Sequence, residues 1–185
     1  MNTSMRKPWE VIRSEPGPDL VLFQTRYDWL QNPRNAKLLK AVILESADWV
    51  NVVAVTPENK IVVVWQYRFG IGRTTLEIPA GILNRGETSE QAAIRELREE
   101  TGYTATRWKY LGWVETNPAF LNNLCHQWLA LDAVKTSDPQ LDDGEEIFVA
   151  ELSLEEVRSE IEKGHMRNSL SLLSLAQVFD LRRKG

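Results

Sequence analysis

Apolar residues along the chain form short runs and stripes that predict both strands and helices. Residues 61–65 read Ile-Val-Val-Val-Trp, and so short an apolar run without alternation is typical of a strand buried on both faces. Other strands are indicated by β-branched and aromatic residues that lie between turn residues. The expected strands are 9–14, 20–31, 37–45, 48–56, 60–68, 75–78, 106–115, 124–133 and 147–151.

The first three expected strands should form a small antiparallel meander. The turn residues Pro-Gly-Pro-Asp at 16–19 separate the first strand from the second. Because a three-stranded piece is small on its own, we expect it to pack against the main domain or against a second subunit. The predicted organisation is an N-terminal β-sheet extension at 1–46 and a main domain at 47–185.

Three helices are expected, and capping residues indicate where most of them begin and end. The first follows a hydroxyl N-cap in Thr88-Ser89 and stops at Gly102. A second begins at Ser153 and stops at Gly164, and the last spans about 169–182. The expected apolar stripes are Ala92, Ala93, Ile94 and Leu97 in the first helix, and Leu170, Leu173, Leu175 and Val178 in the last.

The composition fits a globular protein with a sizeable core and a small extra lobe. The 185 residues are 43% hydrophobic and 26% charged. The net charge is -4, from 22 basic and 26 acidic side chains, so we expect no nucleic-acid polymer as a partner. A single cysteine, Cys125, excludes an intrachain disulfide and a multi-cysteine zinc site. Its strand-like surroundings favour a packing role over that of a nucleophile.

Targeting signals are not visible in the sequence. The N-terminal residues 1–15 lack an apolar core region and a small-residue cleavage site. Apolar runs also fall short of the roughly 18 residues that a membrane span needs. We therefore expect a cytoplasmic protein with no membrane partner.

The charged end of the first expected helix is the most informative stretch. In helical geometry Glu96, Glu99 and Glu100 stand at i, i+3 and i+4, so their carboxylates emerge side by side on one face. Such neighbours repel one another, and the macrodipole disfavours acids near a helix C-terminus. We therefore expect a cation among them. Ligands that are all oxygen favour Mg²⁺ or Mn²⁺ over zinc.

The same stretch resembles the Nudix box. That pattern is Gly, five residues, Glu, seven residues, and then Arg-Glu-apolar-any-Glu-Glu-any-Gly-apolar. The chain fills it at Gly81, Glu87, Arg95, Glu96, Leu97, Glu99, Glu100, Gly102 and Tyr103. Tyr103 stands where the family usually has an aliphatic residue, and we expect it to be half-buried. The resemblance implies an α/β fold, namely an α/β/α sandwich that carries the small N-terminal antiparallel sheet, and metal-assisted attack on a diphosphate.

The resemblance also implies which groups hold the metal. Glu96 and Glu100 are the expected ligands, and the Ala80 carbonyl completes the site. Glu99 lies on the same face and is expected to hold a further ion. Arg95 is four residues before Glu99 and is expected to orient it. Mg²⁺ is the expected cofactor, with Mn²⁺ as a possible substitute.

Two further acidic positions are candidates for the reaction. Glu87 is expected to act indirectly, through water or by holding the loop; the alternative is an acid that only interacts with the helix dipole. Family members often recruit a general base from a loop after the box. Glu145 is the expected base or additional ligand, with Asp143 and Glu146 as alternates, unless this loop is simply solvated.

Segments outside the box resemble the ADP-ribose and nucleoside-diphosphate-sugar pyrophosphatases. They are Gln-Tyr-Arg at 66–68, Leu-Glu-Ile-Pro-Ala-Gly at 76–81, and Pro118, fifteen positions after Tyr103. Pro118 therefore belongs to the expected substrate-binding residues. The residues Asn-Pro-Ala-Phe at 117–120 depart from the Ser-Pro-Gly that is common in ADP-ribose-specific members. The substrate is thus expected to be a small nucleotide sugar of the ADP-ribose or GDP-mannose type.

Other substrate contacts have two interpretations each. Arg68 is a candidate for a phosphate contact and Glu77 for a ribose hydroxyl, or the two form ion pairs at the rim. Trp9 and Trp29 are candidates to stack on the nucleobase, or else they are core or dimer-interface aromatics. The resemblance implies a homodimer to which the N-terminal sheet contributes.

Two other functions remain open at this point. One is a Nudix pyrophosphatase that removes damaged nucleoside triphosphates. The other is a non-catalytic module that binds a nucleotide sugar and regulates a partner. Regulatory modules tend to lose box acids or to carry an added DNA-binding domain, whereas this chain keeps every acid.

Overall fold

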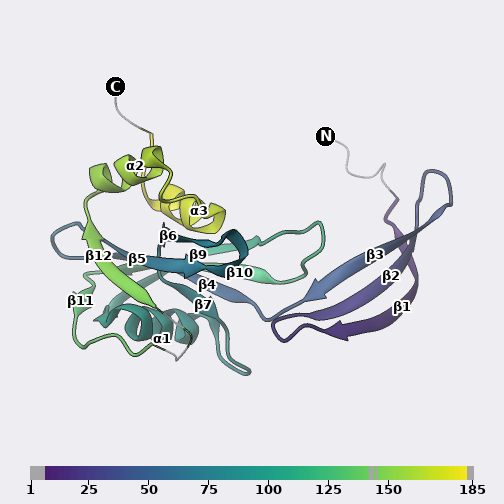
Figure 1. Ribbon diagram of the computed structural model, residues 1–185, viewed down its shortest axis with the longest axis horizontal. Coiled ribbons are helices and arrows are strands. Elements are labelled where there is room, and N and C mark those ends of the chain that lie inside the picture. Colours follow the sequence, from purple (N-terminus) through teal and green to yellow (C-terminus); the bar gives the residue numbers. More distant parts are fainter. Residues whose placement is uncertain (1–6, 142–143, 145, 183–185) are drawn as a thin grey trace. The chain divides into compact units, whose positions relative to one another are not determined.

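The chain forms two units, one of residues 1–47 with 115–123 and one of residues 48–114 with 124–185. The structure is a computed structural model that describes residues 7–141, 144 and 146–182. Figure 1 labels most elements of both units. The predicted division into domains at 1–46 and 47–185, with separate roles, stays a prediction.

The sheet of the first unit is the expected antiparallel meander. Its strands are β1 (Glu10–Asp19), β2 (Gln24–Gln31) and β3 (Leu38–Glu45), in the order β1-β2-β3. Both pairings are antiparallel, and Trp29 on β2 lies opposite Arg13 on one side and Lys40 on the other.

The turn between the first two strands is not where the sequence predicts it. β1 continues through Pro16, Gly17 and Pro18 to Asp19, and the chain turns only after that residue, where Val21 has a φ of 70°. Two prolines fit here because β1 is an edge strand and its register shifts between Pro16 and Asp19. Gly17 is also needed, since a Cβ there would lie 2.2 Å from the Thr25 hydroxyl.

Residues 115–123 belong to the first unit through contacts with β3. The Leu44 amide donates to the Phe120 carbonyl at 2.8 Å, and Leu44 forms a parallel bridge with Leu121. Pro118 therefore lies in a segment that is attached to the N-terminal sheet.

The second unit is built around a mixed sheet. Its path is β12-β5-β4-β10-β9, with β6 beside β5 and β7 beside β4. β4 and β10 are parallel, and β4 pairs antiparallel with β5 and β7. The remaining short elements are the pair β8 and β11 and the 3-10 turn η2. The bounds are β4 Trp49–Val55, β5 Ile61–Arg68, η2 Phe69–Ile71, β6 Arg73–Glu77, β7 Ala80–Ile82, β8 Tyr103–Thr104, β9 Arg107–Glu115, β10 Leu124–Leu131, β11 Val134–Lys135 and β12 Ile147–Leu152.

Helices cover both faces of this sheet, as the predicted α/β/α sandwich requires. Val50 and Val52 of β4 pack in one core with α1 (Ser89–Thr101), whereas Val53 and Val55 pack in a second core with α2 (Leu154–Lys163) and α3 (Ser169–Val178). Figure 1 shows α1 on one side of the sheet and α2 and α3 on the other. The helices of the described residues are too short or too polar to cross a bilayer.

The predicted starts and stops of the first two helices are confirmed. Thr88 caps α1 through a capping box with Gln91, and Gly102 ends it in the left-handed region at a φ of 75°. Ser153 caps α2 in the same way, and Gly164 ends it. These signals are local in sequence, which is why they could be identified without tertiary information.

The last helix is shorter than predicted, and its buried face is different. α3 ends at Val178, and Phe179 is already extended with a φ of -128°. Phe179 packs against the second core from this extended position. Leu172 and Leu175 face this core, whereas Leu173, expected in the apolar face, is 41% exposed.

The apolar stripe of α1 also needs one correction. Ala92, Ala93 and Leu97 are buried as predicted, but Ile94 is 44% exposed. Ile94 follows Ala93 by one residue, so it is rotated by about 100° away from the face that Leu97 shares with Ala93.

These positions predict different responses to truncation. Leu97→Ala should lower the free energy of unfolding by about 3 kcal/mol, because it leaves a cavity beneath α1. Ile94→Ala should change it by no more than about 0.5 kcal/mol, because the side chain is largely in water. Urea unfolding followed by far-UV circular dichroism measures both. Equal losses for the two variants would contradict the observed orientation of α1.

Candidate active site

The last two turns of α1 carry Glu96, Glu99 and Glu100 on one face, as predicted. Their repulsion is offset by a cation from the same helix. The Arg95 guanidinium contacts Glu96 with Nη1 at 2.6 Å and Glu99 with Nη1 at 3.1 Å. The predicted contact between Arg95 and Glu99 is therefore present.

Arg95 also fixes the loop before the helix. Its Nε and Nη2 donate to both oxygens of Glu87 at 2.8 Å, and Nη2 donates to the Ile82 carbonyl at 3.0 Å. Glu87 in turn accepts from the Asn84 amide at 2.9 Å. Glu87 thus holds the loop, which was one of its two expected roles.

The contact between Arg95 and Glu87 shifts the pKa of both side chains. The hydrogen bonds from Arg95 hold the pKa of Glu87 below its ordinary value of 4.5, and the Asn84 amide adds to the effect. The pKa of Arg95 is raised, chiefly by its hydrogen bonds to Glu87. Glu87 therefore stays ionised to a lower pH than an ordinary glutamate would.

Gly81 makes room for the Glu96 carboxylate. A Cβ at residue 81 would lie 2.0 Å from the carboxyl carbon of Glu96, so no side chain fits here without displacing it. β7 holds Gly81 in place, because Gly81 is paired with Val50 of β4. The group that lies against Gly81 is therefore the Glu96 carboxylate.

Glu100 is the buried member of the group. It is 3% exposed, and its Oε2 accepts from the Ala80 amide at 3.0 Å. Glu96 and Glu100 therefore both meet the Ala80–Gly81 segment, one at Gly81 and the other at Ala80. The structure brings together the residues that were predicted to hold the metal, although it is the amide of Ala80 that contacts Glu100.

The donor set has the chemistry of a site for a hard divalent cation. Glu96, Glu99 and Glu100 offer only oxygen atoms, and those three side chains lie within five consecutive residues of one helix. Among residues 7–141, 144 and 146–182, no group of three or more His, Cys, Asp or Glu side chains is arranged as a metal site. Glu96 and Glu99 contact Arg95, and Glu100 contacts the Ala80 amide. Metal binding by these residues stays a prediction.

Arg68 and Glu77 are paired with each other. Arg68 Nε and Nη2 donate to the two oxygens of Glu77 at 2.9 and 2.8 Å. Glu77 is only 1% exposed, and its Oε2 also accepts from Asn168 Nδ2 at 2.7 Å. The geometry favours the second interpretation, an ion pair between Arg68 and Glu77. The Glu77 carboxylate is buried, however, and does not lie at the rim.

Asn168 is a residue that sequence reasoning missed. An asparagine directly before the expected start of the last helix is a typical N-cap, and Asn168 does cap α3. Its second contact, to Glu77, joins residues that are 91 positions apart, and no local pattern predicts such a pair.

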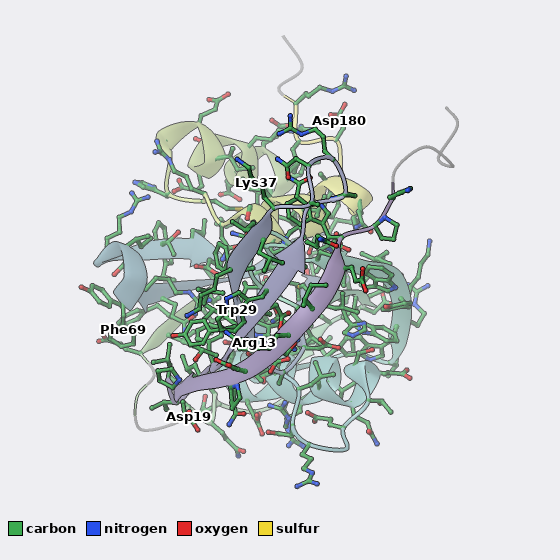
Figure 2. All side chains as sticks on the ribbon, turned by 90° about the vertical axis from the view of Figure 1, so that its right-hand side faces the viewer. Arg13, Asp19, Trp29, Lys37, Phe69 and Asp180 are labelled. Atoms are coloured by element: carbon green, nitrogen blue, oxygen red, sulfur yellow. The ribbon has the colours of Figure 1, made fainter. Side chains whose placement is uncertain are left out.

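The tryptophans predicted to stack on the base lie in or beside the N-terminal sheet. Trp29 is half-buried on β2, and the Arg13 guanidinium lies over its ring at 3.8 Å from the centroid (Figure 2). Trp9 precedes β1 and is exposed. Roles of Trp9, Trp29 and Pro118 in substrate binding stay predictions.

The predicted general base lies outside the described residues. Glu145 and Asp143 are among the positions that the structure does not describe, whereas Glu146 is exposed directly before β12. The choice of base among these residues stays a prediction.

Two further expectations concern single side chains. Cys125 is buried, and burial raises the pKa of its thiol to about 12, which suits a packing residue. Tyr103 is buried rather than half-buried, and its hydroxyl donates to Glu151. Burial, together with that carboxylate, raises the pKa of Tyr103 to about 12.

Comparison with a family model and with curated proteins shows which known proteins this chain is similar to. The family model described as "NUDIX domain" matches residues 47–173. The ADP-ribose pyrophosphatase of Bacillus subtilis (strain 168) is 40% identical over 129 residues, which are 69% of this chain and 70% of that protein. The methanol dehydrogenase activator of Bacillus methanolicus is 34% identical over 142 residues, or 76% of this chain and 77% of that protein.

A solved structure described as an ADP compounds hydrolase has a similar fold. Its TM-score is 0.81, and the alignment covers 93% of this chain and 92% of that one. Since the two sequences are only 19% identical, this likeness supports the fold alone.

The pairing of Glu87 with Arg95 predicts a pH-dependent part of the stability. Because the pKa of Glu87 is lowered on folding, its ion pair stabilises the fold above the ordinary pKa of 4.5, and this contribution is lost as the pH falls through the folded pKa. Glu87→Gln should therefore lower the melting temperature at pH 7, and the gap to the wild type should narrow progressively below pH 4.5. Thermal unfolding over a pH series measures the gap. A gap that is independent of pH would contradict the assignment.

Proposed function

The chain belongs to the Nudix family, and we propose that it hydrolyses the diphosphate of nucleoside diphosphate sugars, with ADP-ribose as the first candidate substrate. The products are a nucleoside monophosphate and a sugar phosphate. The name of the relative from Bacillus subtilis supports ADP-ribose. GDP-mannose and ADP-glucose are further substrates to compare, because the sequence at 117–120 departs from the pattern of ADP-ribose-specific enzymes.

One observation carries the proposal: the carboxylates of Glu96 and Glu100 meet the same short segment, Ala80–Gly81. Glu96 lies against Gly81, and Glu100 accepts from the Ala80 amide. A helix of ordinary structural purpose does not bury an acid near its C-terminus, where the macrodipole opposes it. Carboxylate oxygens brought close together in this way are the ligands that a hard divalent cation prefers.

The residues of the site have distinct tasks in this reaction. Glu96 and Glu100 would hold a divalent cation, Mg²⁺ with Mn²⁺ as a substitute, and Glu99 would hold a further one. When bound, such an ion neutralises charge on the diphosphate and lowers the pKa of the attacking water. Arg95 keeps the carboxylates together, and its contacts to Glu87 and Ile82 fix the preceding loop.

Hydrolysis also needs a proton acceptor. Water attacks phosphorus, the bond from phosphorus to the bridging oxygen breaks, and the proton of the water passes to a base. Glu145 is our choice for this base, because it belongs to the acidic segment that directly precedes β12. Asp143 and Glu146 are the alternates.

Substrate recognition is proposed to involve the residues that the sequence indicated for it. Arg68 would contact a phosphate and Glu77 would support it through their ion pair. Trp9, Trp29 and Pro118 would contribute to the base or sugar pocket. A homodimer formed through the N-terminal sheet belongs to the same proposal. The exposed apolar residues of that sheet support it; they include Val11, Ile12, Leu38, Leu39 and Val42. The cytoplasmic location stays a prediction from the sequence.

Removal of the buried carboxylate tests the metal site. Glu100→Gln should lower the rate of ADP-ribose hydrolysis with Mg²⁺ by at least about 100-fold. Loss of a residue that only orients a metal ligand already costs about 10- to 100-fold, and this change removes a proposed ligand itself. Glu90→Gln is the matched control, since Glu90 is an exposed acid in the first turn of the same helix. Release of phosphate after addition of a phosphatase measures the rate.

The same assay compares ADP-ribose, GDP-mannose, ADP-glucose and NADH. Nucleoside triphosphates, which a phosphatase would itself attack, are compared by the pyrophosphate that their hydrolysis releases, detected with inorganic pyrophosphatase alone. Undiminished hydrolysis by Glu100→Gln, or in excess chelator, would refute the proposed mechanism. A preference for triphosphates would refute the proposed substrate class.

The general base is tested separately. Glu145→Gln should lower kcat by at least about tenfold and leave KM nearly unchanged, since proton abstraction is needed only in the transition state. Asp143→Asn and Glu146→Gln are compared in parallel. If either of these loses more activity than Glu145→Gln, that residue is the base instead.

A further inference from the structure

Strand β6 is held along one edge by β5 and along the other by the segment that leads into α3. The Leu76 amide and the Thr75 hydroxyl both donate to the His165 carbonyl, at 3.0 and 2.9 Å. β6 therefore has a partner on each side, although only one of them is a strand of the sheet.

The first turn of α3 continues this second edge. Asn168 Nδ2 donates to Glu77 at 2.7 Å, while its Oδ1 accepts from the Leu170 and Ser171 amides at 3.0 and 3.2 Å. The Ser171 hydroxyl accepts from the Ile78 amide at 3.4 Å. One asparagine thus caps the helix and also ties that helix to the end of β6.

Buried polar groups make this connection strong. Glu77, Ser171 and the amide of Ile78 lie in the interior, where an unpaired polar group is costly and a buried carboxylate that loses one of its donors is destabilised. The Glu77 carboxylate is shared between Arg68 at the end of β5 and Asn168 at the start of α3. These contacts leave the end of β6 little freedom to shift.

The end of β6 leads directly into the active-site segment. Ile78 is followed by Pro79, whose carbonyl accepts from the Val52 amide at 2.9 Å. Ala80 and Gly81 come next, and they meet Glu100 and Glu96. Only two residues of chain separate Glu77 from the amide that binds Glu100.

We propose that Asn168 is a positioning residue: by holding Glu77 from the start of α3, it sets the place of the Ala80–Gly81 segment relative to Glu96 and Glu100. The consequence for metal binding and catalysis rests on the proposed function. The effect on the position of the segment does not rest on the proposed function, because it concerns the Ala80 amide in the metal-free protein.

The test uses Asn168→Ser in the full-length chain. Serine keeps an oxygen that can cap α3, but it has no amide to donate to Glu77. Gln177→Ser is the matched control, since the Gln177 amide also reaches from α3 to a buried acceptor, Gln127, which lies on β10 and not on β6. The two variants thus remove the same kind of bond at opposite ends of one helix.

Two measurements are made on each variant. Amide hydrogen exchange in the metal-free protein should become faster at Ile78 and Ala80 in Asn168→Ser, and should stay as in the wild type in Gln177→Ser. Titration with Mn²⁺ followed by electron paramagnetic resonance should show affinity weakened by about tenfold in Asn168→Ser, the low end for residues that orient metal ligands. The affinity of Gln177→Ser should stay within about twofold of the wild type, since it is remote from the ligands.

The outcomes separate this inference from the proposed function. Unchanged exchange at Ala80 in Asn168→Ser overturns the inference, whatever the enzyme does. Suppose that Glu100→Gln loses Mn²⁺ affinity and Asn168→Ser keeps the wild-type affinity. That result also overturns the inference, and it leaves the proposed metal site intact. Equal Mn²⁺ affinity in wild type and Glu100→Gln instead overturns the metal site.

Discussion

The site depends on one guanidinium that holds three carboxylates. Repulsion between acids at i and i+4 costs a few tenths of a kcal/mol per pair on an exposed helix, and more where water is excluded. Arg95 contacts Glu87, Glu96 and Glu99, and a hydrogen bond to a charged group contributes roughly 1.5–3 kcal/mol. The attraction to Arg95 therefore exceeds the repulsion, and the carboxylates are held close together.

The Ala80–Gly81 segment complements this helix from the sheet side. β4 pairs with it on one side, so its backbone is fixed where the Glu96 and Glu100 carboxylates approach it. The strand before it, β6, is held by β5 and by the start of α3. Elements from both faces of the sheet thus converge on a segment of two residues, and this explains how one small loop can be placed with the accuracy that metal chemistry requires.

Where predictions from the sequence were wrong, a tertiary contact outweighed a local signal. Pro16, Gly17 and Pro18 read as a turn, yet they extend β1, because an edge strand needs no amide donors on its outer side. Leu173 was placed in the buried face of the last helix, but the core lies on the side of Leu172 and Leu175. A helix made almost entirely of leucine, serine and alanine has little amphipathic contrast, so its orientation is set by what it packs against.

The sequence by itself determined most of the elements and the grouping of acids on one helix. Capping residues fixed the ends of α1 and α2, the apolar run at 61–65 fixed a doubly buried strand, and the spacing of Glu96, Glu99 and Glu100 fixed a carboxylate face. All of these follow from contacts within a few residues, where helix and strand geometry is known in advance. Only the tertiary structure decided that Glu96 lies against Gly81, that Glu100 meets Ala80, and that Glu77 is shared between Arg68 and Asn168. These contacts join positions 9 to 91 residues apart. The packing of helices on the sheet brings such residues together, and no local sequence pattern predicts it.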